Sequence, residues 1–110
     1  MTTPSIPADI LDGPACTTMT QVRAGVDQVD RELVALLRRR FDYMDAAARI
    51  KPAREHVRDE ARKAQVIANA RAAAEAAGMP GAAIAQLFEG LVEASIAYEL
   101  EAFDRRAAGR

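Results

Sequence analysis

The fold of this chain is decided by the stretch from Val22 to Lys51, which reads VRAGVDQVDRELVALLRRRFDYMDAAARIK. Its apolar residues recur at steps of three and four, which is the period of one face of an α-helix. The stretch therefore predicts a single helix over 19–50, about 48 Å long at 1.5 Å per residue. The apolar face consists of Val22, Val26, Val29, Leu33, Leu36, Leu37, Met44 and Ala47.

Capping residues and helix breakers mark where this helix starts and stops. Thr18 or Thr20 can cap its first turn, because a hydroxyl accepts from an unpaired backbone N–H there. Pro52 ends it, because a proline pushes the preceding residue out of the helical conformation. The helix is thus expected to begin directly after a leader and to end at a short charged connection.

Two shorter helices follow, over 60–77 and 82–106. Asp59 can cap the first of them, and Gly78 suits the position just past its end. No alternating strand pattern occurs, so we predict an all-α, three-helix chain with a long first helix. The apolar face of the third helix is expected to hold Ile84, Leu87, Phe88, Leu91, Tyr98 and Ala102.

Length and composition limit the chain to a few classes of protein. Its 110 residues suit one domain, 25 of them are Ala, and 15 Lys and Arg face 16 Asp and Glu. This balance argues against nucleic acid as the main partner. A lone Cys16 beside a single His makes neither an internal disulfide nor a zinc site, and we expect Cys16 to be a bystander. No segment is apolar enough to span a membrane, and none resembles a secretory signal, so we expect a cytoplasmic protein.

We predict a flexible leader over 1–17, a helical domain over 18–106 and a tail over 107–110. A compact monomer of this size has a radius of gyration near 13 Å, so a helix of about 48 Å would project from it. Its apolar face continues along the projecting part. We therefore expect a second copy of the chain to cover that face in a twofold dimer.

Polar residues interrupt the apolar faces at a few positions. Arg40 stands where the first helix should be apolar, and Lys51, eleven residues later, lies on the same face about 16 Å away along the helix. Ser95 and Glu99 are neighbours on the third helix by their four-residue spacing. Such residues can form a ligand site, although a run of arginines at 38–40 is also typical of a solvated helix face.

The pattern V-R-x-x-V-D-x-V-D-x-x-L-V-x-L-L-x-R-R begins at Val22, and A-A-x-R-I-K occupies 46–51. The segments VRDEAR at 57–62 and L-F-x-x-L-V-E-A-S-I at 87–96 follow. Together they resemble the all-helical chorismate mutase family, which includes isochorismate-pyruvate lyases. The resemblance implies an intertwined homodimer of three-helix chains, in which each active site borrows an arginine from its partner.

That arrangement agrees with helix geometry. Arg23 and Arg40 are seventeen residues apart, which is about 25 Å along a helix and about 100° around it. They do not readily meet on one ligand within a chain. Arg23 is therefore expected to act in the partner's site.

The resemblance implies that the partner's Arg23 and the chain's own Arg40 bind the two carboxylates of the substrate, chorismate. Lys51 would donate to the ether oxygen, and Glu99 would reach the same oxygen from the opposite side. The implied reaction is the [3,3] rearrangement of chorismate to prephenate, on the route to aromatic amino acids. It needs no nucleophile, metal or cofactor.

Three further residues take binding roles by the same resemblance. Arg62 provides another cation near the ring, Asp59 contacts or orients that region, and Ser95 lies near the ring carboxylate. Catalysis would then come from holding a compact substrate conformer and stabilising its polarised transition state.

Two residues depart from the family's pattern. Many mutases have Gln where this chain has Glu99, and only the protonated acid can donate to an ether oxygen. We expect a dianionic substrate in a buried site to favour that acid form. Lys63 stands where many bacterial mutases use Glu to hold a substrate hydroxyl, and a charged lysine has no acceptor.

These departures keep other functions open. An isochorismate-pyruvate lyase would give salicylate and pyruvate, and the short loop over 51–57 is similar to that of the lyases. A mutase acting on 4-amino-4-deoxychorismate ranks lower, because a cationic Lys63 disfavours a substrate ammonium. A non-catalytic helical dimerisation module is the remaining interpretation. The cationic residues at 23, 40, 51 and 62 argue against it, because a scaffold needs none of them.

Overall fold

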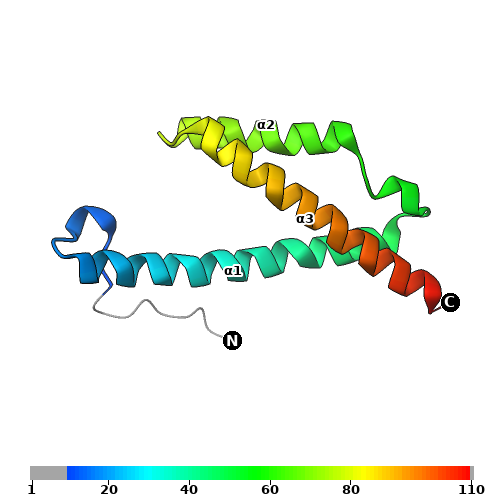
Figure 1. Cartoon of the computed structure of the whole chain (residues 1–110), viewed down its shortest axis with the longest axis horizontal. Coiled ribbons are helices and arrows are strands. Elements are labelled where there is room, and N and C mark those ends of the chain that lie inside the picture. Colours follow the sequence, from blue (N-terminus) through cyan, green and yellow to red (C-terminus); the bar gives the residue numbers. More distant parts are fainter. Residues whose placement is uncertain (1–9, 110) are drawn as a thin grey trace. The chain divides into compact units, whose positions relative to one another are not determined.

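The structure is a computed structural model, and it describes residues 10–109 (Figure 1). Among these residues there are helices and no strand, which confirms the all-α prediction. The three long helices start and end within two residues of the predicted positions. The elements in chain order are the 3₁₀-helix η1 (Gly13–Ala15), α1 (Met19–Ile50), the 3₁₀-helix η2 (Arg54–His56), α2 (Glu60–Ala76) and α3 (Gly81–Ala108).

The start of α1 is fixed by a reciprocal cap. The Gln21 backbone N–H donates to Thr18 Oγ1 at 3.2 Å, and Gln21 Oε1 accepts from the Thr18 N–H at 3.2 Å. This is the capping-box arrangement, which satisfies donors that a helix start leaves unpaired. Of the two threonines that could have capped α1, the structure selects Thr18.

The turn between α2 and α3 follows the predicted chemistry. Gly78 has a φ of +76°, a conformation that glycine adopts without strain. The Met79 N–H donates to the carbonyl of Ala74 at 2.8 Å, and the Gly78 N–H donates to that of Glu75 at 3.0 Å. This pair of bonds is the Schellman motif, so α2 stops sharply and α3 can return along it.

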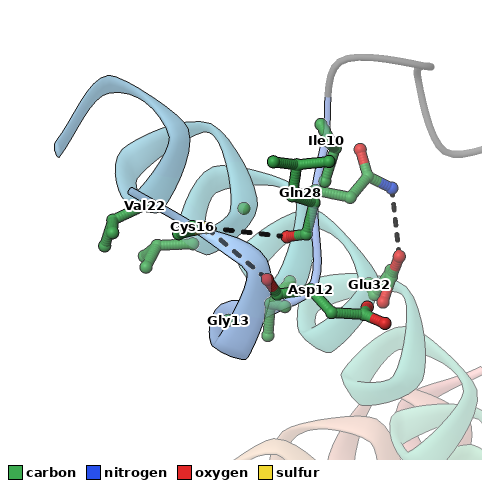
Figure 2. Close-up of a pocket in the computed structure, with 11 residues that line it drawn as sticks. Ile10, Asp12, Gly13, Cys16, Val22, Gln28 and Glu32 are labelled. Atoms are coloured by element: carbon green, nitrogen blue, oxygen red, sulfur yellow. Dashed lines mark hydrogen bonds between the residues drawn. The ribbon is translucent and has the colours of Figure 1, made fainter. Parts of the chain in front are cut away.

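The chain divides into two compact units, Met1–Arg40 and Phe41–Arg110, and each is described separately. In the first unit, the segment around η1 packs on α1, where the Leu11 carbonyl lies 3.6 Å from the position that a Cβ on Gly25 would take. A cavity of about 420 Å³ lies between this segment and Val22 and Val26 (Figure 2). Residues 10–17 of the predicted leader thus pack against the helix, while residues 1–9 lie outside the described part.

Cys16 belongs to this segment. Its thiol donates weakly to the carbonyls of Leu11 and Asp12 at 3.9 and 3.6 Å, as Figure 2 shows. Both acceptors are backbone groups, and a thiol needs a nearby base or cation to become reactive. The contacts suit the bystander role expected for Cys16.

The apolar face of α1 in the first unit is largely open to solvent. Its valines and leucines are between 37% and 56% exposed, although the period of their sequence is that of a buried helix face. A row of apolar side chains this long is unusual on an isolated chain. The residues are Val22, Val26, Val29, Leu33, Leu36 and Leu37.

The core of the second unit forms between the end of α1, the connection and α3. It consists of Ala48, Val57, Val92, Ile96, Ala102 and Phe103, with Val66 and Leu100 packed against it. The rings of Phe41 and Tyr98 lie 4.8 Å apart, and the Tyr98 hydroxyl donates to Asp45 Oδ2 at 3.0 Å. The end of α1 is therefore tied to α3 by apolar packing and by a partly buried polar contact.

One residue predicted to face inward does not do so. Leu87 is 68% exposed, whereas Ala85 two positions earlier is buried. Two residues turn a helix by about 200°, so the two side chains lie on opposite faces of α3. The buried face of α3 is the one that carries Ala85, Val92, Ile96 and Glu99. Across residues 10–109, no helix has the length and hydropathy needed to cross a membrane.

Candidate active site

The centre of the candidate site is an ion pair between the end of α1 and α3. Lys51 Nζ lies 2.6 Å from Glu99 Oε2 and 3.4 Å from the backbone carbonyl of Val57, to which it also donates. The Glu99 side chain is only 5% exposed, and that of Lys51 is 29% exposed. A buried carboxylate needs such a partner, because an unpaired buried charge is costly. The pair is therefore both a structural contact and a pre-positioned cation beside a carboxyl group.

The connection after α1 places these groups. The Lys51 N–H still bonds to the Ala47 carbonyl at 2.9 Å, and Pro52 follows, so the helix stops with Lys51 on its last turn. The chain then turns through η2, and Val57 enters the core of the second unit. Because Val57 is buried against α3, its carbonyl is held where the ammonium of Lys51 can reach it.

Ser95 lies one helical turn before Glu99 on the buried face of α3. Both are buried, with 4% of each residue exposed. The Ser95 hydroxyl donates to the Leu91 carbonyl at 2.7 Å, which holds the side chain against its own helix. The structure thus brings Lys51 and Glu99 into contact, and Ser95 shares the buried face of α3 with Glu99, as the sequence predicts from their spacing.

Asp59 and Arg62 occupy the first turn of α2. Asp59 Oδ1 accepts from the Arg62 backbone N–H at 3.0 Å, so the predicted helix cap is confirmed. The guanidinium of Arg62 donates to Gln65 Oε1 at 2.7 Å and is exposed. Asp59 acts on the backbone of α2, which leaves the binding roles of both side chains as predictions.

The two arginines expected to bind carboxylates belong to the first unit. Arg23 is exposed on α1, and Arg40 is partly buried near the end of that unit. Their convergence on one ligand with Lys51 stays a prediction. Among residues 10–109, no group of three or more His, Cys, Asp and Glu side chains is arranged to hold a metal ion.

A second charged cluster, which the sequence reasoning missed, joins the start of α2 to α3. We call it the Glu93 cluster, and it consists of Arg58, Glu60, Lys63, Glu89 and Glu93. Glu93 accepts from Arg58 through both carboxylate oxygens, at 2.8 and 3.1 Å, and from Lys63 Nζ at 2.7 Å. The same Lys63 Nζ lies 2.7 Å from Glu89 Oε1. The four-residue spacing of Glu89 and Glu93 was the available signal, but it does not identify a partner on another helix.

The electrostatics of this cluster follow from its contacts. Hydrogen bonds from Arg58, and then from Lys63, lower the pKa of Glu93 from 4.5 to about 2, against a smaller opposing effect of desolvation. Bonds to Glu93 and Glu60 raise the pKa of Arg58, and bonds to Glu89 and Glu93 raise that of Lys63. Arg58, Lys63 and Glu93 are therefore charged across the neutral range, and Lys63 is bound to two carboxylates of α3.

The comparisons with known proteins agree with the helical architecture. The model of a family described as chorismate mutase type II matches residues 22–100. A relative named isochorismate pyruvate lyase, from Pseudomonas aeruginosa, is 28% identical over 86 residues, which is 78% of this chain and 85% of the relative. The matched region contains all three long helices except for the start of α1 and the C-terminal end of α3.

Proposed function

Because the chain belongs to the chorismate mutase type II family, we propose that it is a chorismate mutase. It would convert chorismate to prephenate by a [3,3] rearrangement, without a cofactor. The observation that carries this proposal is the buried Lys51–Glu99 pair, which places an ammonium and a carboxyl group side by side. At 2.6 Å the two groups touch, so they would part to admit the substrate's ether oxygen between them.

Lys51 is the proposed electrostatic catalyst. As the ether C–O bond breaks, negative charge builds on the oxygen, and a fixed ammonium stabilises that charge more than it stabilises the ground state. An ammonium has three donors, and in this chain it donates to the Val57 carbonyl and to Glu99. These partners hold the side chain near its proposed position before the substrate arrives, and the ammonium would exchange its direct contact with Glu99 for the ether oxygen.

Glu99 is proposed to act in its protonated form once substrate is bound. A carboxylate beside the developing charge would repel it, whereas a carboxylic acid can donate to the ether oxygen. The acid would then lie across the ether oxygen from Lys51, and the pH profile tests this assignment.

The proposed ligands of the substrate carboxylates are Arg40 and the partner's Arg23. A guanidinium presents two parallel donors and binds a carboxylate in a fixed orientation. Ser95, Arg62 and Asp59 would contact or orient the ring and its carboxylate. Binding at both ends of the substrate would favour the compact conformer in which the two reacting carbons meet.

A dimer is part of the proposal, since Arg23 is expected to serve the other chain. The support is the exposed apolar face of α1, from Val22 to Leu37. A second copy would bury this row against its own helices in a self-complementary interface. Sedimentation of the protein should give a dimer, and a Leu33→Glu variant should shift the protein toward monomer. A monomeric wild-type protein at micromolar concentration would contradict the shared-site arrangement.

Isochorismate-pyruvate lyase is the second candidate, because the relative from Pseudomonas aeruginosa is named for that activity. A lyase would break the same ether C–O bond, so Lys51 could serve either reaction. Lys63 counts against the mutase without favouring the lyase, since its ammonium is held by Glu89 and Glu93 and supplies no carboxylate to a substrate hydroxyl. The two candidates therefore differ in substrate and share the catalytic cation.

The deciding experiment is to incubate the protein separately with chorismate and isochorismate and to identify the products. Prephenate from chorismate would support the mutase. Salicylate and pyruvate from isochorismate, with much slower turnover of chorismate, would make the protein a lyase. No product from either substrate would contradict both and would favour an amino-substituted substrate or a non-catalytic dimerisation module.

A further inference from the structure

We propose that Arg58 and Lys63, bound to Glu93, are positioning residues that fix the connection between α1 and α2 on α3 and thereby hold Lys51 in place. This inference rests on the proposed function, because the group to be positioned is the proposed catalyst. It assigns Lys63 a role that involves no contact with substrate.

The first argument is the geometry of Glu93. Its carboxylate accepts a hydrogen bond from each terminal guanidinium nitrogen of Arg58. One of its oxygens also accepts a hydrogen bond from Lys63 Nζ. A two-point contact between Arg and a carboxylate fixes orientation as well as distance. Arg58 lies just before α2, and Lys63 lies at the end of its first turn. One carboxylate of α3 therefore holds that turn at both of its ends.

The second argument is burial. Only 17% of the Lys63 side chain is exposed, and its ammonium lies 2.7 Å from carboxylate oxygens of both Glu89 and Glu93. An isolated surface ion pair contributes little to stability, but a network with shared partners fixes its members more effectively. Lys63 would have to leave two carboxylates to bind a substrate, which disfavours a role as ligand.

The third argument links the cluster to the site. Arg58 directly follows Val57, the residue whose carbonyl accepts from Lys51 Nζ. On α3, Glu93 directly follows Val92, which belongs to the same core cluster as Val57. The Arg58–Glu93 contact and this core therefore hold the same point of the connection, next to the carbonyl that orients the proposed catalytic ammonium.

The test compares Lys63→Met and Glu93→Gln with the wild-type protein. Arg105→Gln is the control, because it removes an exposed ion pair to Glu101 elsewhere on α3. Lys63→Arg is the conservative variant, since it keeps the positive charge between the two carboxylates. Two readouts are measured for each protein: amide hydrogen exchange over 52–63, and kcat and KM with whichever of chorismate and isochorismate is turned over.

We expect faster exchange over 52–63 in Lys63→Met and Glu93→Gln, with α3 and the control unchanged. We also expect kcat to fall between about tenfold and a hundredfold with KM within about twofold, because a displaced Lys51 affects the transition state more than binding. Lys63→Arg should recover most of both effects. A merely stabilising contact would leave kcat of the folded variants unchanged.

Two results would overturn the proposal. If Lys63 were a substrate ligand, Lys63→Met would raise KM, and Glu93→Gln would leave both constants unchanged. Unaltered exchange over 52–63 in both variants would also contradict it, whether or not the protein turns over either substrate. Absence of wild-type activity would reject the proposed function instead, and the exchange readout separates the two failures.

Discussion

Lys51 Nζ and Glu99 Oε2 lie 2.6 Å apart although 48 positions separate the residues in the chain. The contact joins the last turn of α1 to the buried face of α3, beside the core of the second unit. Because Glu99 is almost fully buried, the ammonium is the partner that makes its charge tolerable. Stability and the proposed catalysis therefore depend on the same pair. Substituting Lys51 alone, and then Lys51 together with Glu99, measures the two contributions separately.

The first prediction concerns this separation. Lys51→Met should abolish turnover and lower the free energy of unfolding by about 1–3 kcal/mol, because it leaves a buried carboxylate without its partner. Adding Glu99→Gln should restore most of that stability, since the amide carries no charge, while the double variant stays inactive. Urea denaturation followed by circular dichroism and a product assay, both at one fixed protein concentration, measure the two effects. Appreciable turnover in either variant would remove Lys51 from the reacting atoms.

The second prediction concerns the proton on Glu99. If its acid form donates to the ether oxygen, activity should fall as the pH rises, because the donor is lost on ionisation. Glu99→Gln should flatten this fall, since an amide donates at every pH. The measurement is kcat/KM against pH for both proteins. Parallel profiles for wild-type protein and variant would assign the pH dependence to another group.

The third prediction concerns acid stability. In the folded protein Arg58 and Lys63 lower the pKa of Glu93 from 4.5 to about 2. A lowered carboxyl pKa stabilises the folded state above the ordinary value, and that contribution is lost as the pH falls through the folded value. Glu93→Gln should therefore melt below wild type at pH 7, and the difference should shrink between pH 4.5 and 2.

Glu101→Gln is the matched control for this experiment. It removes a carboxylate from the same helix, but the contact with Arg105 is 3.6 Å long and both side chains are largely exposed. Such a pair contributes little to stability, so this variant should melt close to wild type throughout. A gap for Glu93→Gln that stays constant down to pH 2 would mean that charge is not the source of its effect.

The fourth prediction tests the shared site. Arg23→Ala and Lys51→Met should each be inactive alone, but mixing them under conditions of subunit exchange should restore activity. In a mixed dimer, one site takes its lysine from the first variant and its arginine from the second. Random pairing then makes roughly a quarter of all sites complete in a twofold dimer. No recovery, with exchange confirmed by mass spectrometry, would place Arg23 in its own chain's site or outside any site.

Much of the fold can be predicted from the sequence, because its determinants are local. The apolar period predicts α1, and the cap formed by Thr18 and Gln21 involves residues three apart. Asp59 and Gly78 mark the two ends of α2 by interactions within one or two turns. The polar spacing on α3 likewise predicts that Ser95 and Glu99 share a face, since four residues nearly complete one turn.

The contacts between helices could not be predicted in this way. Periodicity placed Leu87 inward, yet packing turned the face with Val92 and Ile96 to the core. The family resemblance likewise identified Lys63 only as a departure from the pattern, without its partners on α3. Helical spacing describes neighbours on one helix, whereas the rotation of one helix against another depends on which side chains interlock.

The sequence by itself thus determined three helices, their ends and the family. Only the tertiary structure decided that Lys51 meets Glu99 and that Lys63 and Arg58 meet Glu93. The physical reason is the range of the interactions. Caps and helix periods act over about four residues. These ion pairs instead join residues of different segments, and they depend on the path of the connection, which the burial of Val57 against α3 holds.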